Sequence, residues 1–141
     1  MTGARKDFNV MWPLILALLA GLGGCERMPI EVELEIFSGR PNPTWVLEKS
    51  LQAECVSRLK AMRPALDSAF PPPQGLGYQG FIVRVPKGLD CSGETLVYRG
   101  IAERGGRRYE DPDRRFEKWL LETAGSAIQD ELKLVVKREL Q

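Results

Sequence analysis

The side chains best suited to binding a ligand lie in one nine-residue segment, residues 37–45. It contains Arg40, Asn42 and Trp45, and two prolines stiffen it. A guanidinium offers a planar fork of donors to a carboxylate, and an indole ring offers a stacking face. Tyr78, in a glycine-rich segment further along the chain, is a second aromatic that could join them. These four residues predict a surface that binds a glycan, a peptide or a carboxylate group.

The same segment also has a purely structural interpretation. It could form a stiff corner between a strand and a helix, in which Trp45 covers the core and Arg40 pairs with a glutamate. The segment resembles parts of short uncharacterised bacterial proteins, and this resemblance implies no function.

The chain contains no histidine, and this absence removes much of the usual catalytic chemistry. Ser-His-Asp and Cys-His nucleophilic sites are excluded, as are zinc sites with histidine ligands. A hydrolase that uses two carboxylates remains an alternative. It needs two acids about 5–9 Å apart, and only single candidates such as Glu48 and Glu110 stand out. The sequence therefore predicts no catalytic residue, no metal site and no cofactor.

The first 25 residues have the pattern of an export signal. Arg5 and Lys6 precede a short apolar run that ends in Leu22-Gly23-Gly24-Cys25. This ending resembles the lipobox of bacterial lipoproteins. The resemblance implies cleavage before Cys25, diacylation of its sulfur and acylation of the new N-terminus.

This interpretation divides the chain into a signal peptide (1–24), a lipidated tether (25–29) and a single α+β domain (30–141). It implies a lipid-anchored protein of the bacterial cell envelope, and Glu26 after the cysteine resembles the pattern that sorts lipoproteins to the outer membrane, facing the periplasm. Two alternatives stay open: ordinary signal-peptidase cleavage, and a cytosolic protein translated from Met28.

The charge of the predicted mature chain gives no drive toward nucleic acid. Removing residues 1–24 leaves 117 residues with 18 basic and 18 acidic side chains. A net charge of zero and an envelope location both argue against a nucleic-acid partner. The expected partners are the lipid bilayer, through Cys25, and an unknown envelope protein or glycan.

Two cysteines remain after lipidation of Cys25. Cys55 and Cys91 could pair in an oxidising compartment and close a loop of about 36 residues, a link worth roughly 4 kcal/mol. Alternatively they stay separate, with Cys55 on a buried helix face.

Hydrophobic periodicity predicts five elements. Residues 30–37 alternate between apolar and acidic positions, which is typical of a half-buried strand, and the resulting glutamate stripe should meet Arg84 or Arg99 on neighbouring strands. A helix is expected over 50–62, strands over 80–85 and 95–103, and a helix from Asp111 onward.

The predicted fold class is α+β: a small three-stranded, mainly antiparallel sheet packed on helices, in the order β-α-β-β-α. Gly125-Ser126 could split the last helix. Residues 127–140 are expected to be helical, with a strand over 132–136 as the alternative. The sequence thus predicts a membrane-anchored envelope lipoprotein with a small non-catalytic binding domain.

Overall fold

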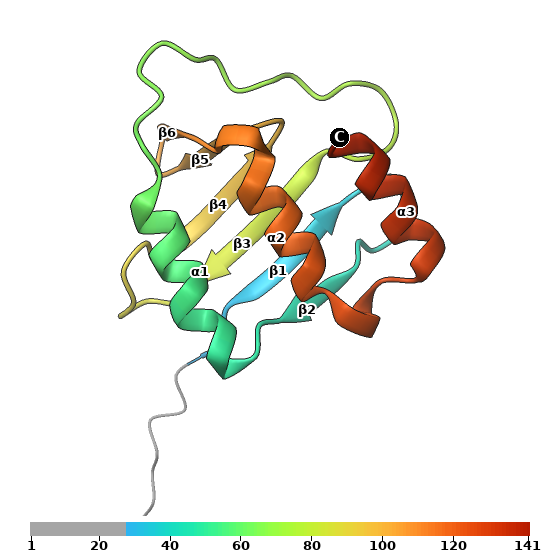
Figure 1. Cartoon of the computed structure of the whole chain (residues 1–141), viewed down its shortest axis with the longest axis horizontal. Helices are drawn as coiled ribbons and strands as arrows, with labels where there is room; N and C mark the ends of the chain where they lie inside the picture. The colour runs from blue at the N-terminus through green and yellow to red at the C-terminus, as the bar shows by residue number, and fades with distance from the viewer. Residues whose placement is uncertain (1–27) are drawn as a thin grey trace, which may run out of the picture.

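The computed structural model of the chain describes residues 28–141 (Figure 1). The predicted signal peptide (1–24) and the lipobox cysteine, Cys25, lie outside this range. In chain order the elements are β1 (Glu31–Glu35), β2 (Thr44–Val46), α1 (Lys49–Ala61), β3 (Gly80–Val85), β4 (Gly93–Tyr98), β5 (Ile101–Arg104), β6 (Arg107–Glu110), the 3₁₀ turn η1 (Pro112–Arg114), α2 (Arg115–Thr123), the 3₁₀ turn η2 (Gly125–Ala127) and α3 (Asp130–Glu139).

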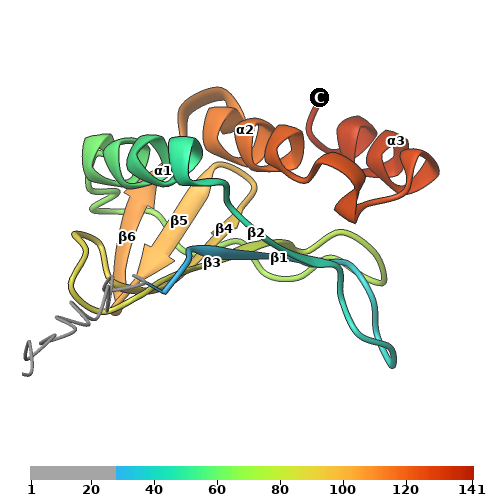
Figure 2. The same ribbon diagram turned by 90° about the horizontal axis from the view of Figure 1, so that it is seen from below.

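The strands form one antiparallel sheet in the order β2-β1-β3-β4-β5-β6. The three α-helices of residues 28–141 lie on one face of this sheet, and within that range no helix covers the other face (Figure 2). The class is therefore α+β, as predicted.

Alternation in β1 decides which face is buried. Val32 and Leu34 are fully buried, and Val32 lies opposite Trp45 on one side and Val83 on the other. The intervening glutamates consequently point to the uncovered face, because successive residues of a strand alternate between faces. The core forms between the apolar face of the sheet and the helices.

The prediction of a three-stranded sheet and of the order β-α-β-β-α is wrong, because the sheet has six strands. Strand β2 directly follows Pro43 and has three residues, which is too short for a periodic pattern to be read. The expected strand over 95–103 is two strands, because Arg99 and Gly100 both adopt positive φ and reverse the chain. Strand β6 has the sequence Arg-Arg-Tyr-Glu, which carries no apolar alternation.

The helices agree better with the prediction. Helix α1 lies within one residue of the expected 50–62. The carboxylate of Asp111 accepts hydrogen bonds from the backbone N–H groups of Phe116 (2.8 Å) and Glu117 (3.2 Å), so it satisfies donors at the start of α2. The expected split near Gly125 is confirmed, and the last segment is helical, since α3 covers most of it.

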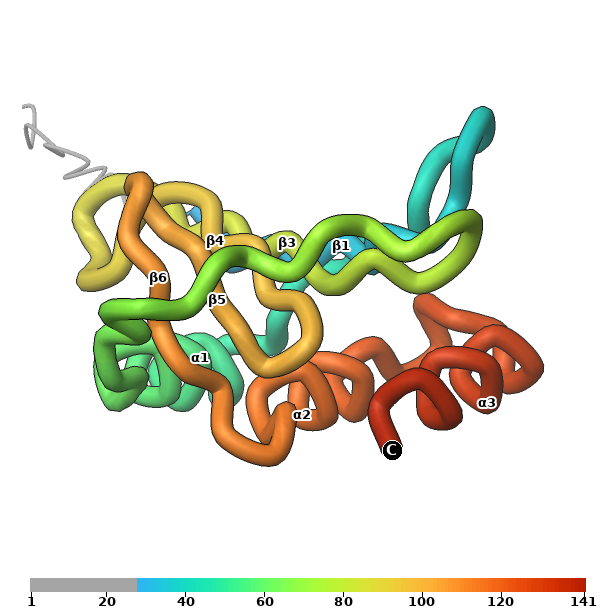
Figure 3. The backbone as a smooth tube through the Cα atoms, turned by 90° about the horizontal axis from the view of Figure 1, so that it is seen from above, coloured from blue at the N-terminus to red at the C-terminus, as the bar shows by residue number. Residues whose placement is uncertain are grey.

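The two ends of β1 point to opposite ends of the domain. β1 starts beside the loop that joins β3 to β4, and it ends at the loop of residues 37–43 (Figures 1 and 2). The long segment 62–79 runs along the ends of the strands from α1 to β3, where Phe70 packs on Tyr98 (Figure 3). Among residues 28–141, none of the helices has the length and apolar character needed to cross a bilayer.

Candidate functional site

A shallow cavity of about 320 Å³ lies between the loop 37–43 and the segment that runs from η2 into α3. Two of the four predicted binding residues, Arg40 and Asn42, line it. Its other lining residues are Phe37, Pro41, Pro43, Ala127, Ile128, Gln129 and Leu132. We refer to it as the loop cavity.

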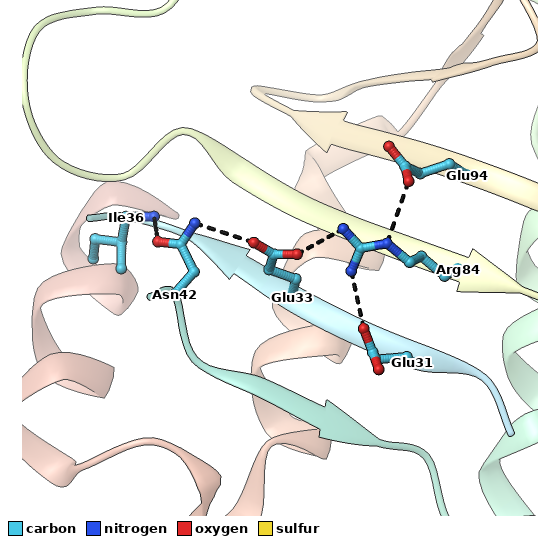
Figure 4. Close-up of polar contacts among 6 residues, drawn as sticks. All are labelled: Glu31, Glu33, Ile36, Asn42, Arg84 and Glu94. Atoms are coloured by element: carbon cyan, nitrogen blue, oxygen red, sulfur yellow. Dashed lines mark hydrogen bonds and ion pairs between the residues drawn. The ribbon is translucent and has the colours of Figure 1, made fainter. Parts of the chain in front are cut away.

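Asn42 fixes the loop to the end of β1. Its Oδ1 accepts hydrogen bonds from the backbone N–H groups of Ile36 (3.1 Å) and Phe37 (2.8 Å). Its Nδ2 donates to Oε1 of Glu33 at 3.2 Å (Figure 4). One asparagine therefore satisfies two backbone donors and orients its amide through a side chain of the sheet.

Glu33 belongs to a charged network on the uncovered face of the sheet (Figure 4). The guanidinium of Arg84 donates to Glu33 (2.7 Å), Glu31 (3.0 Å) and Glu94 (3.2 Å). The expected pairing of the glutamate stripe with Arg84 is thus confirmed. The expected role of Arg99 is wrong, because this residue lies in the turn between β4 and β5, over the ring of Tyr98.

The network moves the pKa values of two neighbouring carboxyl groups in opposite directions. Burial would raise the pKa of Glu33, but hydrogen bonds from Arg84 and Asn42 and the charge of Arg84 outweigh it, and the pKa lies below its ordinary value. Burial and the nearby charge of Glu33 raise the pKa of Glu35.

These opposite shifts predict opposite pH dependences. Because the folded pKa of Glu33 is depressed, the stability it contributes is present above its unfolded pKa and is lost as pH falls through the folded pKa. Glu33→Gln should lower the free energy of unfolding by about 1 kcal/mol at pH 7, since the pair is partly exposed, and should have little effect near pH 2.5. Thermal unfolding of both proteins from pH 7 to 2.5 measures this difference.

Glu35→Gln is the matched control on the same strand. The raised pKa means that ionised Glu35 costs stability, so this variant should be slightly more stable than the wild type at pH 7. A Glu33→Gln difference that stays constant with pH would contradict the assignment.

Arg40 is the charged group of the loop cavity. Its side chain is exposed, and its guanidinium carbon lies 3.5 Å from the centre of the Phe37 ring. Within residues 28–141, Arg40 forms no ion pair, so the alternative in which it pairs with a glutamate is not what the structure shows. A cation held on an aromatic face keeps its donor edge available to a ligand.

Trp45 and Tyr78 are not brought to this cavity. Trp45 is 7% exposed, its Nε1 donates to Oγ1 of Thr123 (3.0 Å) and its ring packs edge-on against Phe81. Tyr78 is 6% exposed and donates its hydroxyl hydrogen to Glu117. For Trp45 this agrees with the structural alternative, in which the indole covers the core.

Sequence reasoning missed the buried carboxylate of Glu117. This side chain is fully buried and accepts from the backbone N–H of Gly100 (2.8 Å), from Arg114 Nη2 (2.9 Å) and from Tyr78. Arg114 also donates to the carbonyl of Glu139, so the cluster joins α2 to the end of α3 and to the β4–β5 turn. Arg114 is the N-cap of α2 and lies three residues before Glu117, and this i, i+3 spacing is the one signal for the pair in the sequence.

Burial of this cluster keeps the Tyr78 hydroxyl protonated. Burial and the negative charge of Glu117 both raise the pKa of Tyr78. The phenol therefore acts as a hydrogen-bond donor to a carboxylate, which suits a contact that holds elements together.

Cys55 and Cys91 are both free thiols in the structure. Burial raises the pKa of Cys55 to about 12, which makes its thiol a poor nucleophile. Cys91 is partly buried in the β3–β4 loop, at a positive φ of 61°. The disulfide stays a prediction.

A second cavity, of about 440 Å³, lies between the end of α1 and the start of α2, and Glu110 and Asp111 are among its lining residues. Both carboxylate oxygens of Asp111 are already engaged by backbone donors of α2. In residues 28–141, no group of three or more Cys, Asp or Glu side chains is placed to hold a metal ion.

Comparison of the chain with models of known protein families, with curated proteins and with solved structures gave no match. The candidate site thus consists of the loop 37–43, which Asn42 anchors to β1, the exposed guanidinium of Arg40 and a shallow wall from η2 and α3.

Proposed function

We propose that this chain is a lipid-anchored protein of the bacterial cell envelope whose small α+β domain binds another envelope component, a protein or a glycan, through the loop cavity. The observation that carries the binding proposal is the exposed guanidinium of Arg40, held over Phe37 at the mouth of a preformed cavity.

A fixed loop favours binding because little conformational entropy is lost when a partner docks. Asn42 ties the loop to β1 with two backbone hydrogen bonds, and its own amide is oriented by Glu33. Arg84 in turn donates a hydrogen bond to Glu33, so the charged network on the sheet helps to hold Asn42, and with it the loop, in place.

The chemistry of the cavity indicates the kind of group it accepts. The guanidinium offers a planar donor fork to a carboxylate, and the amide of Gln129 can donate to or accept from hydroxyl groups. Ile128 and Leu132 supply apolar wall around these polar groups. A carboxylate-bearing segment of a protein or of a cell-wall glycan has this combination.

The anchoring proposal rests on the lipobox resemblance at Cys25, and Glu26 supports placement at the outer membrane, facing the periplasm. A non-catalytic domain is favoured over the hydrolase alternative because Asp111, one of the two acids that line the cavity between α1 and α2, is engaged as a helix cap. The cytosolic alternative that starts at Met28 predicts an unmodified N-terminus.

Arg40→Ala is the direct test of the binding proposal. The full chain, purified from membranes of its host, should have an N-terminal mass that matches acylated Cys25. It should also sediment with purified cell-wall glycan or crosslink to an envelope protein through a photoreactive group at Ser38. Arg40→Ala should reduce that binding at least tenfold, because the charged donor fork is lost.

Arg99→Ala is the matched control, since Arg99 is also exposed and also lies over an aromatic ring, at 5.4 Å from Tyr98. Equal binding by wild type and Arg40→Ala would overturn the binding proposal. An unmodified N-terminus at Met28 would overturn the anchoring proposal.

A further inference from the structure

We propose that an apolar groove beside the start of β1 is the surface on which the domain rests against the lipid bilayer. This inference depends on the lipid anchoring at Cys25 proposed above, and it specifies which part of the domain meets the membrane.

The groove has a volume of about 620 Å³ and is lined mainly by apolar side chains. Its apolar lining residues are Met28, Pro29, Val85, Pro86 and Leu89. Met28 is 72% exposed, so its apolar side chain is open to solvent at the groove. Val85 is buried and Leu89 packs against the core, so the exposed apolar surface at the groove comes mainly from Met28 and Pro29.

A neighbouring cavity extends this surface toward α1. It has a volume of about 450 Å³, shares Gly88 and Leu89 with the groove, and is also lined by Lys49 and Val56. The β3–β4 loop thus has apolar contacts available on both of its sides. This loop is the part of the domain that projects beside the start of β1 (Figure 2).

Chain length places the groove at the membrane. Cys25 is three residues before Met28, so the two Cα atoms are separated by at most about 11 Å even in a fully extended chain. The acyl chains attached to Cys25 must insert into the bilayer. A groove that begins at Met28 is therefore held within reach of the headgroup region.

The charges around the groove are nearly balanced, so the contact is apolar rather than electrostatic. Glu31 and Glu94 are paired with Arg84, and Lys60 pairs with Asp90 at 3.0 Å. Three further charged side chains near the groove form no ion pair within residues 28–141: Glu48, Lys49 and Lys87. Lys87 can keep its ammonium in the headgroup layer while its methylene chain lies against the apolar wall.

This orientation leaves the loop cavity free. The loop 37–43 is at the opposite end of β1 from the groove, so it points away from the bilayer when the groove faces it (Figures 2 and 3). Arg40 would then be presented to partners on the side away from the membrane.

Quenching of a reporter tryptophan by brominated lipid tests this orientation. The full lipidated chain carrying Lys87→Trp is incorporated into phosphatidylcholine vesicles whose acyl chains are brominated. A second chain carrying Leu76→Trp is the matched control, because Leu76 is 89% exposed on the loop near the other end of the domain. After subtraction of the wild-type signal, emission from position 87 should be quenched at least threefold more than emission from position 76. The difference should persist in 0.5 M salt, because the contact is apolar.

A second substitution separates orientation from simple proximity. Met28→Asn, added to Lys87→Trp, should reduce the quenching at position 87 at least twofold, while Leu66→Asn, at another exposed apolar residue, should leave it unchanged. Equal quenching at positions 87 and 76 in a chain of acylated mass would overturn the orientation alone. A chain without acyl mass that does not sediment with the vesicles would overturn the anchoring proposal and this inference together.

Discussion

Arg114→Ala is expected to lower the free energy of unfolding by about 3–5 kcal/mol, because it leaves the carboxylate of Glu117 buried without its charged partner. Glu117 is fully buried, and its two oxygens are shared among Arg114, Tyr78 and the backbone of Gly100. The substitution also removes the hydrogen bond from Arg114 to the carbonyl of Glu139 at the end of α3. Urea unfolding followed by tryptophan fluorescence measures the loss, since Trp45 and Trp119 are both in the core.

Arg115→Ala is the matched control for this prediction. Arg115 is the next residue of the chain, and its side chain is 71% exposed. Its only ion pair within residues 28–141 is with Asp113, which is also exposed, at 3.7 Å. An exposed pair of this kind should contribute less than about 1 kcal/mol. If the two alanine variants were equally stable, Glu117 would not depend on Arg114 for charge compensation.

Gly80→Ala is expected to destabilise the domain by about 4 kcal/mol. Gly80 starts β3 at a φ of +109°, a conformation that costs an L-residue about 1–3 kcal/mol. An added Cβ would in addition overlap the carbonyl oxygen of Val97 and lie 3.0 Å from Cβ of Tyr98, both on β4. Relief of this overlap requires β3 and β4 to separate at the centre of the sheet, and thermal unfolding should show a large decrease in Tm.

Gly93→Ala isolates the steric part of that effect. Gly93 starts β4 at a nearly identical φ of +106°, but a Cβ added there meets no atom within 4 Å. This variant should show only the backbone strain, about 1–3 kcal/mol. Equal destabilisation by both substitutions would mean that close approach between the strands contributes nothing at Gly80.

Several features could be predicted because they depend on neighbours in sequence. The alternation from Ile30 to Phe37 is local, and it correctly indicates which face of β1 is buried. Proline and acid residues at 111–113 and the glycine at 125 mark helix ends through local backbone preferences, and α2 begins and ends close to these positions.

The number of strands could not be predicted in this way. Strands β2, β5 and β6 are three or four residues long, which is too short for a periodic pattern. Such strands form because partners distant in sequence supply their hydrogen bonds, as β1 does for β2. The positive φ of Arg99, which splits the expected long strand, likewise depends on the hairpin it closes.

Part of the candidate site follows from the sequence, and the rest depends on tertiary packing. By itself the sequence determined that a stiff loop carries Arg40 and Asn42, and that no histidine chemistry is available. Only the tertiary structure decided that Trp45 and Tyr78 turn into the core, and that η2 and α3 supply the other wall of the cavity. The reason is physical: residue type fixes what a side chain can do, whereas its burial depends on long-range packing that places segments 80 or more residues apart against each other.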